Sequence, residues 1–298
     1  MMIDVRTTIA ELTAIRSRPG VVAVDDAVLR VEGPGAVACM QGILTNDIEK
    51  VALPALVHGA ILTPKGMIIT TLWCRRDPAG ITLIVPREGT AALLEQLRRS
   101  FPPRLAKVRD VSAEHSVWWL LGGAEAPSGA EILRPSGPAP FEGLWIGPAS
   151  GAPEALPHGT TVGPSWWPTA LRLLDGWPAL GREIDEKTLP QEVRFDELES
   201  VKYDKGCYVG QETVARLHFR GHPNRTLRAV IGEGAPPTQA EVHGEDRAVG
   251  SISTLALIDD RWVGMAKLRR EVEDGATVTV DDRPGTVTPF PLELQALA

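Results

Sequence analysis

The chain has 298 residues, with 31 basic and 38 acidic side chains and a formal net charge of −7. Hydrophobic residues make up 43% and charged residues 23%, which is typical of a folded globular protein and excludes wholesale disorder. An acidic chain is not a general nucleic-acid binder. The length predicts two or three domains, with a core large enough to need no disulfide or metal.

The cysteine count bears on the cellular compartment. Cys39, Cys74 and Cys207 are odd in number and lack CxxC spacing, so neither a disulfide framework nor a zinc finger is predicted. No apolar run approaches the roughly 18 residues that a membrane span requires. Charges near the N-terminus interrupt the apolar core that a signal peptide would need. We therefore expect a reduced, cytoplasmic protein with no membrane partner.

The first half of the chain predicts alternating helices and strands. Ile9, Leu12 and Ile15 lie three apart, which predicts a helix over about residues 7–17. Two short apolar runs then predict a hairpin about Asp25-Asp26, and Pro34 suits the start of a short helix. The further expected elements are strands at 58–62 and 67–73 joined by a turn at 63–66, a strand at 81–85, an amphipathic helix at 89–100, and strands at 108–111 and 116–121.

The second half of the chain has a different pattern of Gly, Pro and apolar residues. Residues 122–168 contain 18 Gly or Pro in 47 residues, so we expect loops and edge strands there. Ser165 is expected to cap a helix at 168–174 that ends at Gly176. Beyond residue 225, short β-forming runs separated by Gly, Asp and Pro predict a small barrel or sandwich of about 70 residues. These runs are 227–231, 240–242, 248–253, 262–268 and 277–280.

The charge is unevenly distributed along the chain. Between Lys202 and Arg228, six bases and two acids give +4, which leaves −11 for the rest. We call this segment the basic island. It can hold an anionic ligand, or it can be a solvated helix face. We expect it to border the mouth of a pocket.

The basic island contains the most distinctive run of residues, KGCYVGQE. Lys205 lies two residues before Cys207, and a nearby cation favours the reactive thiolate. A helix within residues 210–221 would place this thiol near a positive helix end, although the alternation there also permits a strand. Cys39 and Cys74 have apolar neighbours and are predicted to be core residues.

Other common catalytic motifs are absent from the sequence. It contains no G-x-S-x-G, P-loop, G-x-G-x-x-G or H-E-x-x-H run. His218 and His222 are four apart, but Gly221 lies between them and no further ligands are evident, so no metal site is predicted. Two Trp pairs, at 118–119 and 166–167, suit a core or interface, and a flat aromatic cofactor could also stack on such rings.

The segment KGCYVGQETVARLHFRG closely resembles the signature of the YgfZ family of folate-binding proteins, relatives of the aminomethyltransferase of the glycine cleavage system. Further pieces resemble elements of that family in the expected order: QGILTND, ILTPKGMI, LRLLDGWPALGREI, LPQE and HPNRTLRAV. The resemblance spans about residues 27–270. It implies an α+β fold, in which two α+β halves form a folate-binding body over residues 1–222 and a small C-terminal β-barrel follows over residues 223–298.

The resemblance also implies a ligand and partners. The ligand is tetrahydrofolate or another reduced folate, and the partners are iron–sulfur assembly or client proteins. Cys207 and Lys205 correspond to the family's Cys and Lys and are the expected catalytic pair. The expected folate contacts are Asn46, Asp47, Trp167, Arg172, Asp175, Gln211, Glu212 and Arg225. Trp-rich walls with Arg or Lys at the mouth would suit the flat pterin and the anionic glutamate tail.

One departure from the relatives affects the expected activity. The transferases supply an acid near the folate nitrogens from a run that here reads IVPREGTAALLEQ, which contains no aspartate. Aminomethyl transfer is therefore not expected, and whether the protein is an enzyme stays open.

Three hypotheses remain. The first is a folate-dependent accessory factor for iron–sulfur cluster assembly or repair, in which Cys207 ligates a cluster or exchanges thiols. The second is a tetrahydrofolate-dependent one-carbon transferase or demethylase. The third is a folate-binding protein without catalysis, in which KGCY is structural.

Overall fold

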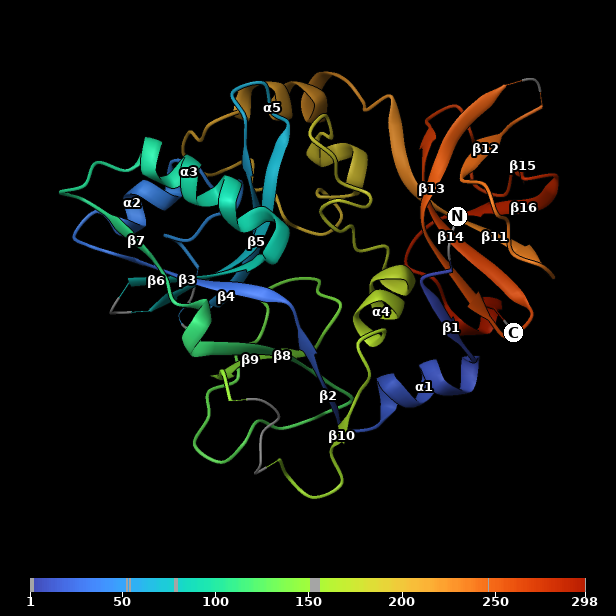
Figure 1. Cartoon of the computed structure of the whole chain (residues 1–298). Coiled ribbons are helices and arrows are strands. Elements are labelled where there is room, and N and C mark those ends of the chain that lie inside the picture. The colour runs from blue at the N-terminus through green and yellow to red at the C-terminus, as the bar shows by residue number, and fades with distance from the viewer. Residues whose placement is uncertain are drawn as a thin grey trace.

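The computed structural model describes residues 3–51, 53, 55–77, 80–150, 156–245 and 247–297. Across these residues the fold is α+β, as predicted, and consists of a five-stranded sheet, a four-stranded sheet and a C-terminal barrel (Figure 1). Four short 3-10 turns accompany them: η1 (Arg87–Gly89), η2 (Ser112–Glu114), η3 (Pro190–Val193) and η4 (Leu294–Leu297).

The five-stranded antiparallel sheet carries two helices. Its strands are, in spatial order, β4 (Ala55–Leu62), β5 (Ile68–Asp77), β6 (Gly80–Pro86), β3 (Asp26–Glu32) and β7 (Lys107–Asp110). The helices are α2 (Ala36–Gln41) and α3 (Thr90–Ser100). Met40, Leu93 and Leu97 of these helices share one apolar core with the sheet, so the predicted amphipathic face of α3 is confirmed. The predicted turn between β4 and β5 is also confirmed, with Gly66 at a φ of +86°.

The four-stranded sheet corrects one prediction. Its order is β10 (Thr161–Val162), β2 (Gly20–Val24), β8 (His115–Leu121) and β9 (Gly143–Pro148). The hairpin expected about Asp25-Asp26 is wrong, because β2 pairs with β8 whereas β3 pairs with β6 in the other sheet. The physical reason is that Val21 and Leu29 are buried in different cores, and this burial overrides local pairing. Asp25 and Asp26 therefore lie where the chain crosses between sheets.

The Gly- and Pro-rich stretch from residue 122 to 168 supplies the edges of this sheet, as expected, and residues 151–155 of it lie outside the described residues. It leads into α4 (Trp167–Asp175). Ser165 does not cap this helix, because the cap position falls on Trp166, which makes no side-chain cap bond. The predicted end is correct: Gly176 follows with a φ of +64°.

The C-terminal strands close into a barrel. They follow the order β13 (Ala248–Ile258), β12 (Glu241–His243), β15 (Thr277–Val280), β16 (Arg283–Thr288), β11 (Arg225–Glu233) and β14 (Arg261–Arg269), and β14 pairs back onto β13. Five of these strands match the predicted runs, while β16 was not anticipated. The N-terminal strand β1 (Val5–Thr7) adds to β13 in parallel, so the two ends of the chain share one sheet.

The helices α1 (Ile9–Ser17) and α4 lie between the barrel and the rest of the fold (Figure 1). The helix α1, capped by Thr8 and close to its predicted bounds, buries Leu12 in a core that also contains Leu171 of α4 and Ala256 of β13. The segment α5 (Gln211–Arg220) is a helix, which decides against the strand that the sequence also permitted. In the part of the chain that the structure describes, no helix is long and apolar enough to cross a membrane.

Candidate functional site

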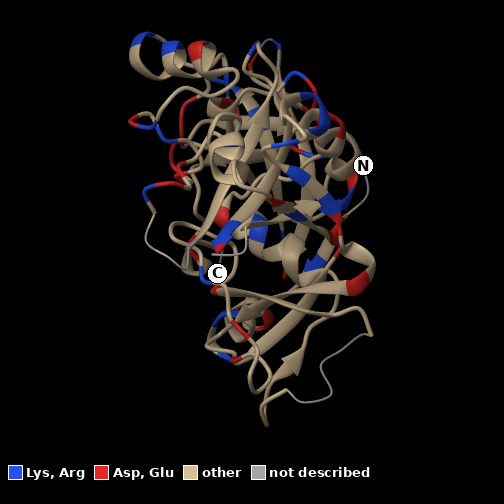
Figure 2. Cartoon of the chain, turned by 90° about the vertical axis from the view of Figure 1, so that its left-hand side faces the viewer, with Lys and Arg blue, Asp and Glu red and all other residues tan. Residues whose placement is uncertain are grey.

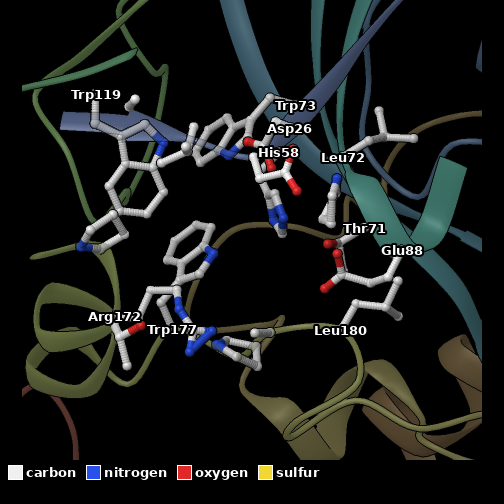
Figure 3. A pocket seen from close by; sticks show the side chains of 18 of the residues that line it. Asp26, His58, Thr71, Leu72, Trp73, Glu88, Trp119, Arg172, Trp177 and Leu180 are labelled. Atoms are coloured by element: carbon white, nitrogen blue, oxygen red, sulfur yellow. The ribbon is translucent and has the colours of Figure 1, made fainter. Parts of the chain in front are cut away.

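The candidate site is a cavity of about 620 Å³, which lies within the range of pockets that bind small molecules. Its wall is assembled from segments that are far apart in the sequence (Figure 3). The lining residues are Ala23, Val24, Asp25, Asp26, His58, Thr71, Leu72, Trp73, Pro86, Glu88, Trp119, Ser165, Pro168, Thr169, Arg172, Trp177, Pro178, Ala179 and Leu180.

Three rings form the centre of the wall. His58 on β4 and Trp73 on β5 are direct cross-strand partners, and their ring centroids lie 4.9 Å apart. The ring of Trp177 lies 4.8 Å from that of His58 and stacks on Trp73 at 5.5 Å with an interplanar angle of 9°. Parallel indoles beside an imidazole offer a flat, apolar surface to an aromatic ligand.

The end of α4 fixes Trp177 in this position. Gly176 must be glycine, because its φ is +64° and a Cβ there would lie 2.2 Å from Cγ of Phe290. Arg194 donates from Nη1 to the carbonyls of Asp175 and Gly176, at 2.7 and 3.0 Å, which satisfies the end of the helix. The Asp175-Gly176-Trp177 run thus turns the chain and directs the indole into the cavity.

Arg172 of α4 supplies the cavity with a cation. Its Nη1 lies 4.0 Å from Oε2 of the fully buried Glu183, and burial lowers the pKa of the guanidinium. Glu183 is otherwise engaged by the backbone N–H of Ala179 and by the Ser253 and Thr254 hydroxyls. Among the described residues, the Arg172 side chain donates no hydrogen bond, so its donors remain available to an anionic ligand.

Three carboxyl groups line the same cavity, those of Asp25, Asp26 and Glu88. Burial, followed by the charges of Glu88 and Asp25, raises the pKa of Asp26 to about 7, against a lowering contribution from Arg87. Because a carboxyl group with such a pKa exchanges its proton near neutrality, Asp26 can act as an acid or a base. His58 shows the opposite response: burial lowers its pKa to about 3, which keeps the imidazole neutral.

Of the predicted folate contacts, only Arg172 lines this cavity. Asn46 lies on the other side of the His58 and Trp73 wall, in a second cavity of about 150 Å³ that shares these two residues. Its Nδ2 donates to the carbonyls of His58 and Glu199, at 2.7 and 2.8 Å. The Oδ1 of Asp47 accepts from the backbone N–H groups of Glu49 and Lys50, and these bonds help to lower its pKa against the effect of burial.

Four more predicted contacts lie outside the lining. The Trp167 ring packs against Gly20 and Gly163, where a Cβ would come within 2.8 and 2.2 Å of it. Asp175 accepts a hydrogen bond from Arg16 at 2.5 Å, and burial raises its pKa. Gln211 and Glu212 begin α5.

The remaining contact, Arg225, begins β11 and lines a separate pocket on the barrel with Arg269 and Arg270. None of the six bases of the basic island lines the central cavity, so the prediction that this island borders its mouth is wrong. Burial explains part of this: Lys205 lies in the interior, whereas Arg216 and Arg220 are exposed on α5. Basic and acidic residues are intermingled along the ribbon rather than separated (Figure 2).

Lys205 and Cys207 have contrasting environments. Lys205 is 6% exposed, and its Nζ donates to the carbonyls of Gln41, Leu44 and Asn46 at 2.9, 2.5 and 2.8 Å. Burial lowers its pKa to about 8. Cys207 is exposed, whereas Cys74 is buried, which raises its pKa to about 12.

Comparison with known proteins agrees with this architecture. No protein-family model matches the chain. It is 24% identical over 304 residues to the tRNA-modifying protein YgfZ of Cronobacter sakazakii, covering 91% of this chain and 92% of that protein. A protein of the same name from Enterobacter sp. is 25% identical over 309 residues, covering 92% of this chain and 93% of the relative. The chain is a relative of the YgfZ proteins.

Two further similarities extend the comparison. The iron–sulfur cluster assembly factor IBA57 homolog, mitochondrial, of Mycosarcoma maydis is 26% identical over 248 residues, covering 74% of this chain and 59% of that protein. The crystal structure of the glycine cleavage system aminomethyltransferase T from Bartonella henselae superposes with a TM-score of 0.76 at 16% identity, covering 96% and 90% of the two chains. Together with the YgfZ relatives, it confirms the aminomethyltransferase-like fold.

Sequence reasoning missed the residues that form the centre of the cavity: Asp26, His58, Trp73, Glu88 and Trp177. The sequence offered a signal for Trp177. This residue directly follows Gly176, which ends the helix, so the turn fixes the position of its side chain. Asp26, His58 and Trp73 reach the cavity through strand pairing within the five-stranded sheet, which their neighbours in the sequence do not reveal.

Proposed function

We propose that this protein binds a reduced folate in the central cavity and acts as an accessory factor in iron–sulfur cluster assembly or repair. The observation that carries the folate assignment is a cavity of ligand size, whose wall combines two stacked indoles with an arginine that donates no hydrogen bond among the described residues. The indoles suit the flat pterin, and Arg172 suits a glutamate carboxylate. The aminomethyltransferase relatives support the same ligand class.

The iron–sulfur assignment rests on a different part of the molecule. Cys207 is exposed, and a thiolate is a ligand that iron prefers. One cysteine cannot hold a cluster alone, and within the described ranges no three His, Cys, Asp or Glu side chains gather as a metal site. A second protein or a small thiol would therefore complete the coordination. The relative named as an assembly factor supports this role.

The folate proposal is tested by anaerobic calorimetric titration with tetrahydrofolate. We expect Arg172→Gln to weaken binding about tenfold or more, because a charge-assisted bond to a carboxylate is lost. The matched control is Arg99→Gln, at a side chain that is 72% exposed on α3, and it should bind as the wild type does. Circular dichroism confirms that each variant is folded. Wild-type affinity in Arg172→Gln would argue against this cavity as the folate site.

The iron–sulfur proposal is tested by complementation of a deletion strain, with iron–sulfur enzyme activity as the readout. Cys207→Ser should restore much less activity than the wild type, because the exposed thiol is removed. Cys39→Ser, at a half-buried thiol packed beside the core of the five-stranded sheet, should restore full activity. Full rescue by Cys207→Ser would remove the thiol from the mechanism and would leave folate binding intact as a separate result.

One observation favours a second function, one-carbon transfer. The sequence lacks the aspartate expected after β6, but Asp26 and Glu88 line the cavity and Asp26 can exchange a proton near neutral pH. Turnover of N-methyl or aminomethyl donors with tetrahydrofolate, abolished by Asp26→Asn, would support this function. No turnover across such a panel, under conditions where folate is bound, would leave the accessory role. The engagement of Lys205 with backbone carbonyls favours a structural role for that residue in either case.

A further inference from the structure

His58 presents an unpaired acceptor to the cavity. Its Nδ1 lies 2.6 Å from Oγ of Ser200, and that hydroxyl donates to the carbonyl of Leu198 at 3.3 Å. With the Ser200 proton directed to the Leu198 carbonyl, the Ser200 oxygen accepts from Nδ1–H; this tautomer leaves a lone pair on Nε2, and the inference below rests on it. The imidazole points into the cavity (Figure 3), and the described residues provide no partner for Nε2.

The surroundings of His58 keep it in this state. The residue is 6% exposed and lies among the rings of Trp73, Trp177 and Phe195, at centroid distances of 4.9, 4.8 and 5.4 Å. Burial in this aromatic cluster lowers its pKa to about 3. His58 is therefore a neutral acceptor throughout the physiological range, and a ligand N–H is the group that would complete it.

Asp26 lies at the crossing between the sheets, paired in register with Pro86 at the end of β6. Three acids gather at this end of the cavity, since Asp25 and Glu88 also line it. Arg87, the cation whose charge lowers the pKa of Asp26, is engaged by Asp25 at 3.0 Å. The neutral His58 lies beside Asp26, and Arg172 lies across the cavity (Figure 3). The charge of Glu88 acts on the pKa of Arg172.

These charges determine which form of Asp26 suits a folate. The glutamate tail of a folate is anionic, so an ionised Asp26 beside Glu88 repels the ligand, and protonation removes that repulsion. A protonated Asp26 also becomes a donor. The wall then offers two groups to the edge of a flat nitrogen heterocycle. The Asp26 carboxyl is the donor, and Nε2 of His58 is the acceptor.

We propose that His58 and Asp26 determine specificity in the central cavity, with His58 Nε2 accepting an N–H of a neutral, flat nitrogen heterocycle, and that the ligand binds more tightly when Asp26 carries a proton. This inference rests on the proposed folate site and deepens it. It assigns the heterocycle to the Asp26 end of the cavity and the carboxylate of the ligand to Arg172.

The test is the dissociation constant of tetrahydrofolate between about pH 6 and about pH 8.5, measured anaerobically by calorimetry. Wild-type binding should weaken about tenfold or more across this range, because each pH unit above the pKa removes nine-tenths of the protonated form. Asp26→Asn should bind with little pH dependence. The matched control is Asp25→Asn, at an adjacent carboxylate that is 81% exposed, and it should keep the pH dependence.

A second variant tests the acceptor. His58→Phe keeps a ring among the indoles but removes Nε2, so it should weaken binding by about tenfold at every pH while retaining the wild-type pH dependence. His243→Phe, at an exposed barrel histidine, should have no effect. A wild-type profile that is flat, or that tightens as pH rises, overturns this inference and leaves folate binding standing. Absence of tetrahydrofolate binding at every pH overturns both the inference and the proposed function.

Discussion

The central cavity and the Lys205 anchor of the KGCYVGQE segment use their polar side chains in opposite ways. In the segment, Lys205 donates to three backbone carbonyls, and Asn46, in the loop that Lys205 contacts, donates to two more. In the cavity, by contrast, the guanidinium of Arg172 and Nε2 of His58 lack hydrogen-bond partners among the residues described. Lys205 and His58 are equally buried, each 6% exposed, so exposure alone does not separate these two residues.

This difference indicates where a ligand belongs. Folded proteins satisfy nearly all of their buried polar groups, so a buried group without a partner requires an explanation. Lys205 has its partners within the chain and thus needs no ligand. Arg172 and Nε2 of His58, which have no hydrogen-bond partner among the described residues, converge with Asp26 on one cavity, where a ligand would complete them. A distinctive local motif can therefore mark a structural anchor, whereas the binding groups are distributed along the chain.

The largest expected effect concerns the anchor. Lys205→Met removes the ammonium from three carbonyls and leaves them buried without a donor, so we expect the free energy of unfolding to fall by about 3 kcal/mol. Urea denaturation measures this change. Lys202→Met is the matched control, because that lysine is 42% exposed and makes one ion pair, with Glu199 at 3.5 Å. Its substitution should change stability by less than about 0.5 kcal/mol.

Tetrahydrofolate affinity distinguishes an anchor from a catalytic lysine. The folded fraction of Lys205→Met should bind the ligand as the wild type does, because Lys205 does not line the cavity. Unchanged stability together with lost activity would reverse the interpretation and restore Lys205 to the reacting groups.

The second expected effect is smaller and has the opposite sign. Asp26 has a folded-state pKa of about 7 against an ordinary value of 3.8, so the folded state holds more protons between these values. Stability therefore falls as pH rises through this window, and the penalty is complete above about pH 7. Asp26→Asn should raise the free energy of unfolding by about 1–2 kcal/mol at about pH 8, after solvent screening of a half-buried group. At about pH 3 the gain should disappear, since both states are then largely protonated.

Asp25→Asn provides the comparison in the same denaturation series. Its carboxylate is 81% exposed and pairs with Arg87, and its charge contributes less to the pKa of Asp26 than burial does, so its substitution should produce a much smaller pH-dependent gain. A stabilisation of Asp26→Asn that is equal at both pH values would show that the effect is not due to proton linkage. The pH-dependent cost of the buried Asp26 carboxylate would then no longer distinguish the cavity from the Lys205 anchor.

Much of the fold could be predicted from local patterns. The end of α4 at Gly176 and the β4–β5 turn depend on residues within a few positions of each other, and both were predicted correctly. The hairpin about Asp25-Asp26 failed because its two strands bury residues in different cores. Such a competition between local pairing and distant burial is not visible in a window of ten residues.

The candidate site was much harder to predict than the fold. Arg172 was identified because the sequence around it resembles the family. His58, Trp73 and Trp177, by contrast, meet only because the β4–β5 hairpin and the loop after α4 pack together. Each of them reads in isolation as an ordinary core residue. Resemblance to the family implied the kind of ligand, and the three-dimensional arrangement was needed to locate a cavity for it.

A smaller effect is expected from the residue that orients His58. Ser200→Ala removes the acceptor for Nδ1–H, so we expect a loss of about 1 kcal/mol in the free energy of unfolding. Nitrogen NMR of the imidazole should show the Nδ1–H tautomer in the wild type and a larger Nε2–H population in Ser200→Ala. The control Ser17→Ala, at the exposed end of α1, should leave the His58 spectrum unchanged. A single, unchanged tautomer in Ser200→Ala would mean that Ser200 does not orient the ring.

The smallest effect on stability is expected at Cys207, two residues from the anchor. Its exposed thiol should react first with a chromogenic disulfide, whereas the buried Cys74 should react only on unfolding, because burial raises its pKa to about 12 and blocks access. Cys207→Ser should abolish the fast phase and change the free energy of unfolding by less than about 0.5 kcal/mol. A fast phase that persists in Cys207→Ser would have to come from the half-buried Cys39. The contrast between an essential anchor and a freely reactive thiol would then no longer hold within the motif, and the proposed role of Cys207 with a partner would lose its chemical basis.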